Sequence, residues 1–434
     1  MFDLWGKLTR MRNSSLARNT SWMIVGLGGN SLVQAGAFVL LARLLGVTEY
    51  GIFAGAFALV STVTPYSSLG SQMIFMRHVS ADRNTAQAYW GNMFVITAAA
   101  TLLLTASLAV AGVKLFGAGS VGLIVVLVVA NCFMGQITNN ASVVFQTFEH
   151  LKATAWLRTM SNLLRLVSIA ILMIGLRHAT AFQCSLGILA SSTVAAAVAF
   201  VWVRRVVGKM KFSGRLFRQR FWEGIGFSVA GSTQAVYNDV DKMMLSHYGM
   251  NAANGIYSMA YRVVDFATIP VNAIDTACLP RYFALNREGL VAVTRLARRI
   301  VPIGALSGLA AAGFTLLAAP FMVRLVGHGF GEALLAFRWL CWLPALRGIH
   351  QLAGGVLTAS GRQNYRTIAQ FAVAALNFVL NLIWIPTHGW LGAAWASLIS
   401  DGALGVLNLS LVLVVLISAS KDNNVPTPEE EFSR

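Results

Sequence analysis

Residues 45–65, LGVTEYGIFAGAFALVSTVTP, are followed 203 residues later by a similar stretch, YGMNAANGIYSMAYRVVDFATIP at 248–270. In both stretches a Gly ends one apolar run, a short polar loop follows, a Gly-Ile-aromatic triplet starts the next run, and a Pro interrupts it. The equivalent residues are Gly46 and Gly249, Gly51 and Gly255, and Pro65 and Pro270. A parallel repeat of this kind predicts a membrane protein with two similar lobes, which is how many transporters surround a central pathway.

A second pair of segments supports the duplication. Residues 146–176 align with residues 358–388 when the chain is shifted by 212 positions. Each segment begins with a polar, basic turn and continues into an apolar run that has a polar residue near its middle, Arg165 in one copy and Asn377 in the other. Two aligned blocks in the same order favour duplication over coincidence.

The composition places the chain in a lipid bilayer. Hydrophobic residues make up 56% of the 434 positions and charged residues only 11%, with a mean hydropathy of +0.66. Runs of about 20 apolar residues can cross a bilayer only as helices or closed barrels, and no run alternates as barrel strands do. We therefore predict an all-α polytopic membrane protein with about 12 transmembrane helices in two six-helix lobes. The expected spans are 21–42, 50–70, 90–113, 120–140, 156–176, 181–203, 222–245, 253–280, 300–322, 333–359, 366–386 and 391–418.

The expected organisation follows from these spans. Residues 1–203 form an N-terminal lobe with spans one to six, and residues 222–418 form a C-terminal lobe with spans seven to twelve. A basic cytoplasmic linker at 204–221 joins the lobes, and a polar cytoplasmic tail follows at 419–434.

The formal net charge of +17 is explained by membrane orientation rather than by nucleic acid. Of the 33 lysines and arginines, 24 lie on the same side as the N-terminus and five on the other side, and four fall within spans. The positive-inside rule then predicts that both termini are cytoplasmic. The dense basic segment 204–220 is explained as an orientation signal and linker, with contact to anionic lipid as the alternative.

Three stretches carry a resemblance to a known family. They are ARLLGVTEYGIF followed by SSLGSQMIFMRHVSA, NDVDKMMLSHYGMNAANGIYSMAYR ending in LPRYF, and ASGRQNYR leading to IPTHGWLGAAWASLISD. The chain resembles the Wzx-type polysaccharide-biosynthesis flippases from about residue 18 to about residue 418. These belong to the multidrug/oligosaccharidyl-lipid/polysaccharide exporter superfamily, with the multidrug and toxin extrusion antiporters and the lipid II flippase.

The resemblance implies an activity and a location. A Wzx-type protein would carry an undecaprenyl-pyrophosphate-linked oligosaccharide across the bacterial inner membrane by alternating access, for O-antigen, capsule or exopolysaccharide assembly. Its partners would be the lipid-linked glycan, the bilayer, and polysaccharide polymerase and assembly proteins. The sugar is not specified, because the matching stretches belong to the scaffold.

Charged residues deep in a span are costly and are therefore functional candidates. Arg165 lies near the middle of span five, and no acid occurs within the first six spans. Arg347 lies near the centre of span ten, where Pro344 is expected to kink the helix, and His350 shares its face. We predict that these residues line a cavity in which arginines bind pyrophosphate oxygens. The alternatives are hydrogen bonds to helix carbonyls for Arg165 and an ordinary interhelical contact for His350.

Other residues are candidates with stronger alternatives. Arg262 is three residues from Asp265, which favours a local ion pair, and Arg338 is close enough to a span end to reach the interface. Asp239 and Asp241 are expected to neutralise Lys242. The further polar candidates share helix faces, where they either bind sugar hydroxyls or tie helices together: Asn30, Gln34, Asn377 and Asn381.

All acids near or within spans lie in the second half, where Asp265 and Asp401 are deepest. We predict that they exchange a coupling cation, H⁺ or Na⁺, while the first lobe supplies anion-binding charge through Arg165. Cys132, Cys184, Cys278 and Cys341 show no metal-ligand spacing, and no cofactor or metal is expected. The alternatives are a drug or organic-cation antiporter and a membrane polysaccharide polymerase or ligase. No nucleophilic or phosphate-loop motif supports an enzyme.

Overall fold

The structure, a computed structural model, describes residues 15–176, 178–286 and 289–422. Within these ranges every regular element is a helix, and eight helices are long and apolar enough to cross a membrane. Each of the twelve expected spans falls on one helix or on consecutive helices, so the predicted fold class is confirmed. Residues 423–434 of the expected tail lie outside the described ranges.

The chain forms two compact units, Met1–Ala252 and Ala253–Arg434. This division reflects how residues pack within each unit. It does not test the lobe boundaries predicted from the sequence, which remain predictions. The first unit contains α2 (Ser15–Ser68), α3 (Ser71–Val79), η1 (Arg83–Thr85), α4 (Ala86–Phe116), η2 (Ala118–Ser120), α5 (Val121–Val128), η3 (Val129–Gly135), α6 (Gln136–Thr147), α7 (Leu151–Gly175), α8 (Ala181–Val207) and α9 (Gly214–His247). The second contains α10 (Asn251–Ala267), α11 (Ile269–Asn286), α12 (Leu290–Val326), η4 (His328–Phe330), α13 (Ala333–Leu340), α14 (Leu343–Ala359), α15 (Gln363–His388) and α16 (Trp390–Asp422).

The internal repeat is visible in the backbone. Gly46 interrupts α2 with a φ of 69°, and Gly249 separates α9 from α10 with a φ of 71°. Both values lie in the left-handed region, where a side chain is strained, so both copies use Gly to end a span. The bounds also repeat, because α5 to α6 spans residues 121–147 and α13 to α14 spans residues 333–359, an offset of 212 residues at each end.

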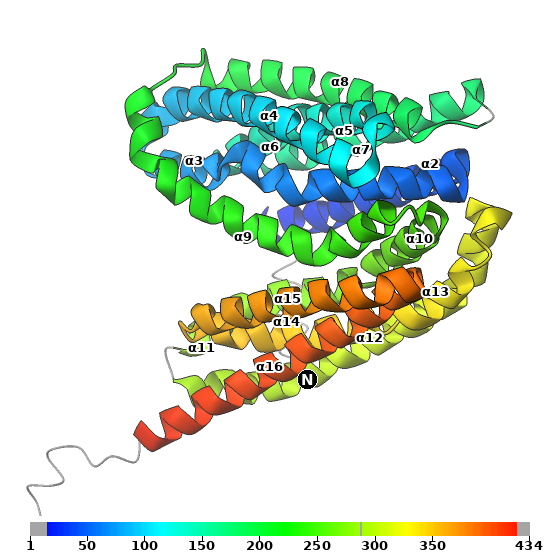
Figure 1. Cartoon of the computed structure of the whole chain (residues 1–434). Coiled ribbons are helices and arrows are strands. Elements are labelled where there is room, and N and C mark those ends of the chain that lie inside the picture. The colour runs from blue at the N-terminus through cyan, green and yellow to red at the C-terminus, as the bar shows by residue number, and fades with distance from the viewer. Residues whose placement is uncertain (1–14, 177, 287–288, 423–434) are drawn as a thin grey trace, which may run out of the picture. The chain divides into compact units, whose positions relative to one another are not determined.

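The second expected span, 50–70, ends where α9 crosses it. Gly70 has a φ of 64° between α2 and α3, and a Cβ on it would lie 2.4 Å from the carbonyl oxygen of Gly224 in α9. Beside this contact, the Ser228 hydroxyl donates to the carbonyl of Pro65 at 3.0 Å, and the Ser232 hydroxyl donates to the carbonyl of Thr62 at 2.7 Å. Glycine thus permits a close backbone approach and serines satisfy carbonyls near the proline. Figure 1 shows α9 running past α3 and along α2.

The connection between α8 and α9 is held against α4 by hydrogen bonds to its backbone N–H and carbonyl groups. The Asn92 side chain donates to the carbonyl of Ser213 at 3.0 Å and accepts from the Ser213 N–H at 2.9 Å. The Lys211 N–H donates to the carbonyl of Gln87 at 3.1 Å, and Gln87 Nε2 donates to the carbonyl of Val207 at 3.1 Å. The basic segment is therefore anchored to its own unit.

We expect Asn92→Ala to destabilise the first unit. Asn92 is 4% exposed, and its removal leaves the Ser213 N–H without its partner, at a cost of about 1–3 kcal/mol, while the Ser213 carbonyl keeps only the Phe217 N–H at 3.1 Å. Thermal unfolding of the purified protein should show a lower Tm. Asn84→Ala is the matched control, because Asn84 is exposed. Equal Tm values for the two variants would contradict this role.

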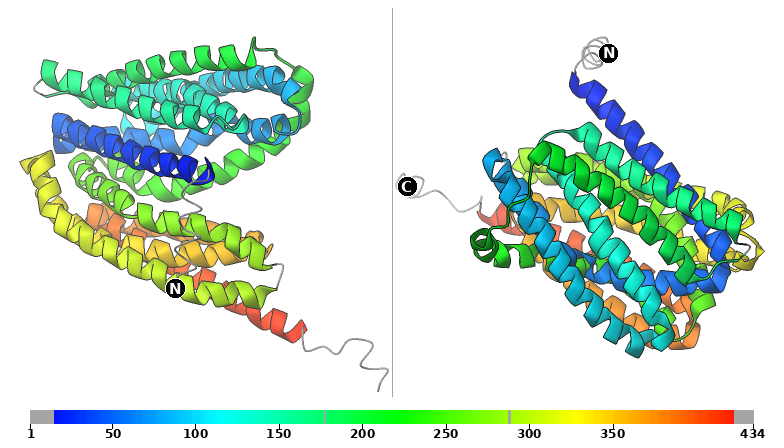
Figure 2. Two further views of the ribbon diagram at one scale, coloured as in Figure 1. Left: turned by 180° about the vertical axis from the view of Figure 1, so that it is seen from behind. Right: turned by 90° about the horizontal axis from the view of Figure 1, so that it is seen from above.

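The second unit is a helix bundle in which α12 packs on α14, α15 packs on α16, and α14 packs on α16. Figure 2 shows these helices, coloured from yellow-green to red, lying side by side. A buried cluster of Tyr282, Leu352, Val356 and neighbouring apolar residues holds α11, α12 and α14 together. This packing places α10, α14 and α16 so that polar side chains from all three helices meet.

Candidate functional site

A polar pocket lies within the first unit between α6, α7 and α8. Its cavity volume is about 270 Å³, and we call it the arginine pocket. Most of its lining side chains carry a hydroxyl, amide or guanidinium group. The lining residues are Gly135, Thr138, Asn139, Ser142, Arg158, Ser161, Asn162, Arg165, Ser192 and Ala195.

One face of α7 supplies the charge of this pocket. Arg158, Ser161, Asn162 and Arg165 are spaced at i, i+3, i+4 and i+7, so the helix presents them together. Gly135, which also lines the pocket, ends the π-helical turn η3, and such turns within helices often mark functional sites. No acid is among the lining residues, so the pocket suits an anion with hydroxyl groups around it.

The second unit contains a buried cluster of charged side chains. Arg347 of α14 donates from Nη1 to Asp265 Oδ1 of α10 at 3.0 Å, and its Nε lies 3.5 Å from Asp401 Oδ2 of α16. Arg347 Nη2 also donates to the Tyr261 hydroxyl, and His350 Nε2 lies 3.6 Å from Asp401 Oδ1. We call these five residues the charge cluster.

Exposure differs across the charge cluster. The Asp265 side chain is 39% exposed, that of Arg347 is 12% exposed and that of Asp401 is 3% exposed. The cluster therefore extends from an accessible carboxylate to a buried one through a single guanidinium. Because an isolated buried charge is costly, the contact with Arg347 offsets part of the cost of burying the Asp401 carboxylate.

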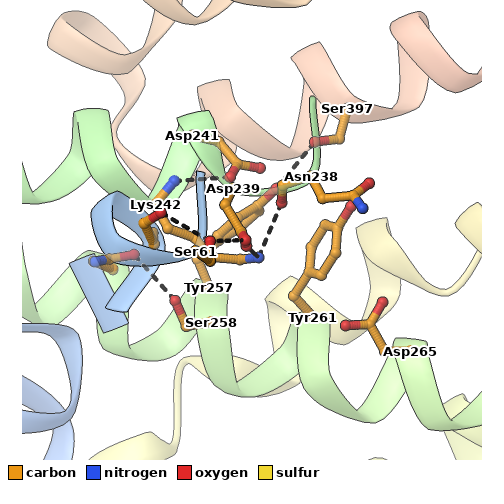
Figure 3. A network of polar contacts seen from close by, with 12 residues as sticks. Ser61, Asn238, Asp239, Asp241, Lys242, Tyr257, Ser258, Tyr261, Asp265 and Ser397 are labelled. Atoms are coloured by element: carbon orange, nitrogen blue, oxygen red, sulfur yellow. Dashed lines mark hydrogen bonds and ion pairs between the residues drawn. The ribbon is translucent and has the colours of Figure 1, made fainter. Parts of the chain in front are cut away.

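There are two smaller polar contacts, one in each unit. In the first unit, Lys242 Nζ forms an ion pair with Asp239 at 2.6 Å, Asp239 accepts from the Ser61 hydroxyl, and Asp241 accepts from the Lys242 N–H (Figure 3). The expectation that these acids balance Lys242 is confirmed for Asp239. In the second unit, the hydroxyls of Tyr257 and Ser397 are 3.0 Å apart, while Tyr261 and Asp265 extend from the same helix, α10 (Figure 3).

The structure distributes the predicted site residues over several environments. Arg165 lines the arginine pocket, whereas Arg347 and His350 belong to the charge cluster with Asp265 and Asp401. The ion pair of Asp265 is with Arg347 of another helix rather than with Arg262 of its own. Pro344 does not kink a continuous helix, because α13 ends at Leu340 and α14 begins at Leu343, one residue before the proline.

The remaining polar candidates that the structure describes have different surroundings within their own units. Asn381 donates to Asn377 at 2.9 Å and Asn377 donates to the Ser400 hydroxyl at 3.1 Å, with both amides at most 3% exposed. This favours the helix-tying alternative for that pair. Gln34 and Arg338 are exposed, Arg262 is half-buried, and the side chain of Asn30 lies outside the described part of the chain.

Sequence reasoning missed two important contributors. Arg158 lies near the start of the fifth expected span, and its spacing of seven residues from Arg165 could have placed both on one helix face. Tyr261 was not considered, and no local pattern links it to Arg347, which is 86 residues away.

Comparison with solved structures defines the class of fold. An inward-facing multidrug resistance MATE family transporter of the MOP superfamily matches with a TM-score of 0.75 and 14% identity, over 91% of this chain and 96% of that chain. An outward-facing structure of such a transporter matches with a TM-score of 0.61 and 15% identity, over 92% of this chain and 94% of that chain. A MOP superfamily transporter from Pyrococcus furiosus matches with a TM-score of 0.61 and 14% identity, over 90% of this chain and 93% of that chain. That transporter is described as having a binding pocket of reverse polarity, which suggests a different function. The fold is that of MOP-superfamily transporters.

The sequence family is more specific. Residues 16–286, more than half of the chain, match the family model described as polysaccharide biosynthesis protein. The chain belongs to this family. No curated protein matches the chain in sequence.

Proposed function

We propose that this protein is a flippase for undecaprenyl-pyrophosphate-linked oligosaccharides. It moves them across the bacterial inner membrane by alternating access during O-antigen, capsule or exopolysaccharide assembly, and both of its termini are cytoplasmic. The observation that carries this proposal is the arginine pocket in a member of the polysaccharide biosynthesis family.

The chemistry of the pocket supports an anionic glycan. Arg158 and Arg165 offer planar guanidinium groups that can bind phosphate oxygens through paired, charge-assisted hydrogen bonds. The hydroxyl and amide groups around them, including Thr138, Asn139 and Ser161, are suited to sugar hydroxyls. The isoprenoid tail remains in lipid during the movement, so only the polar part has to be accommodated by the protein.

An organic cation is a poorer fit for the same pocket. Two arginines and no lining acid repel positive charge. The description of reverse pocket polarity in the Pyrococcus furiosus transporter provides a parallel for a MOP-type fold with a changed charge preference.

The charge cluster is proposed to couple transport to a cation gradient. Asp265 is accessible and Asp401 is buried, and Arg347 contacts both. A change in hydration that moves Arg347 toward one carboxylate would leave the other to take up H⁺ or Na⁺. This assigns the anion and the cation to different units of the chain.

Deletion of the gene tests the proposal in cells. The lipid-linked oligosaccharide should accumulate on the cytoplasmic leaflet, and the wild-type gene should restore surface polysaccharide. The Arg158→Ala/Arg165→Ala double variant should fail to do so at equal membrane abundance, whereas Lys114→Ala, which removes an exposed charge at the end of α4, should succeed. Full rescue by the double variant would refute the assignment of the pocket.

A further inference from the structure

A second cavity of the first unit lies at the end where α7 begins and α8 ends. It is an open groove of about 570 Å³ lined by Trp156, Ala197, Val198, Val201, Trp202 and Arg205, and we call it the tryptophan groove. It shares no lining residue with the arginine pocket. Its chemistry is different, since it combines an apolar floor, two indoles and one cation.

The groove has a polar end and an apolar end. Val198, Val201, Trp202 and Arg205 follow an i, i+3, i+4, i+7 spacing and share one face of α8. Arg205 lies two residues before the end of α8 at Val207, and Val198 lies about 10 Å deeper along the helix. This distance corresponds to the step from a lipid headgroup to the upper part of an acyl chain.

The two indoles form a rigid wall. Trp156 and Trp202 meet edge to face with ring centroids 5.5 Å apart, and Trp202 is held from behind by Phe145 at 4.8 Å. Trp156 is nevertheless 51% exposed. Tryptophans near the ends of membrane helices are typical of the membrane interface, where the ring contacts acyl chains and the N–H faces headgroups.

The charge at this end of the unit is positive. The segment 204–220 contains Arg204, Arg205, Lys209, Lys211, Arg215, Arg218 and Arg220 and no acid. Lys152 adds a further cation in the first turn of α7, and Glu149 in the preceding turn is the acid nearest to it in sequence. The segment is anchored to α4 through Asn92, and Arg205 at its start lines the groove.

We propose that the tryptophan groove binds an anionic phospholipid of the surrounding bilayer. Its phosphate is bound by Arg205, and one acyl chain lies along Ala197, Val198 and Val201 beside the Trp156 ring. This site is separate from the proposed substrate pocket and does not depend on which solute the protein carries. A basic residue near an anionic membrane surface contributes enough to change lipid affinity several-fold.

The matched pair Arg205 and Arg204 tests this proposal. Both are exposed and adjacent on α8, but only Arg205 lines the groove. Phosphatidylglycerol should raise the Tm of the purified full-length protein more than phosphatidylcholine does, and native mass spectrometry should detect retained phosphatidylglycerol. Arg205→Gln should weaken this binding by about 5-fold and remove most of the difference in Tm, while Arg204→Gln should preserve both.

A further variant and a second lipid distinguish between the possible occupants of the groove. Trp156→Ala should reduce retention of phosphatidylglycerol and lower the Tm measured in detergent alone only slightly, because the ring is half-exposed and loses one edge-to-face contact. Equal losses in Arg204→Gln and Arg205→Gln would show general surface attraction and overturn the proposal. Stabilisation by undecaprenyl phosphate but not by phosphatidylglycerol would also overturn it, because the groove would then belong to the transported lipid.

Discussion

Replacing Arg347 by alanine is expected to abolish transport and to lower the free energy of unfolding by about 3 kcal/mol. The change leaves Asp401, which is 3% exposed, without its guanidinium partner at 3.5 Å, and removes the 3.0 Å contact to Asp265. Removing one partner of a buried ion pair costs about 3–5 kcal/mol, and the lower value applies here because Asp265 is partly solvated. Surface polysaccharide in complemented cells and thermal unfolding of the purified variant measure the two effects.

Two further variants separate stability from coupling. Arg347→Met combined with Asp401→Asn removes both charges of the buried contact, so much of the lost stability should return while transport remains absent. Arg347→Lys keeps the charge but cannot contact Asp265, Asp401 and Tyr261 together, so it should be intermediate in both measurements. Normal transport by the Met/Asn double variant would contradict a role of the charge cluster in coupling.

Reversing the charge of Arg165 should reduce transport by at least about 100-fold, since a hydrogen bond to a charged group contributes about 1.5–3 kcal/mol and a glutamate would also repel the phosphate. The Tm should change little, because Arg165 is half-buried in an open pocket rather than in the apolar core. Initial rates of translocation in proteoliposomes provide the measurement.

Arg43→Glu is the control for Arg165→Glu. Arg43 is an exposed residue of α2 outside the arginine pocket, and its substitution makes the same change in net charge. It should leave the rate within about two-fold of the wild type, as expected for screened surface charge. Similar losses in both variants would indicate that total charge, rather than the pocket, determines transport.

The helices and their order could be predicted because the bilayer imposes simple rules on the sequence. Hydropathy located each span, and Gly46 and Gly249 marked equivalent breaks that the structure reproduces with almost equal φ values. The end of the second span at residue 70 was also predicted, but its cause was not, because that cause is the close approach of Gly224 from a helix about 150 residues away.

The site was less accessible to sequence analysis, because it consists of contacts between distant segments. Arg165 could be selected from its depth and from the absence of acids in the first six spans. Arg347 was predicted to bind substrate for the same reason, but the sequence could not show that Asp265 and Asp401 lie on either side of its guanidinium. Depth in a span therefore selects candidate functional charges, and tertiary contacts identify the side chains that they meet.

Translocation by the purified protein tests the central claim most directly. Proteoliposomes would carry undecaprenyl-pyrophosphate-linked oligosaccharide on one leaflet, and an impermeant glycosidase would report its appearance on the other. We predict rapid translocation by the wild type, loss of translocation in Arg158→Ala/Arg165→Ala, and no transport of a lipophilic organic cation. Transport of the cation without translocation of the lipid-linked glycan would contradict the account.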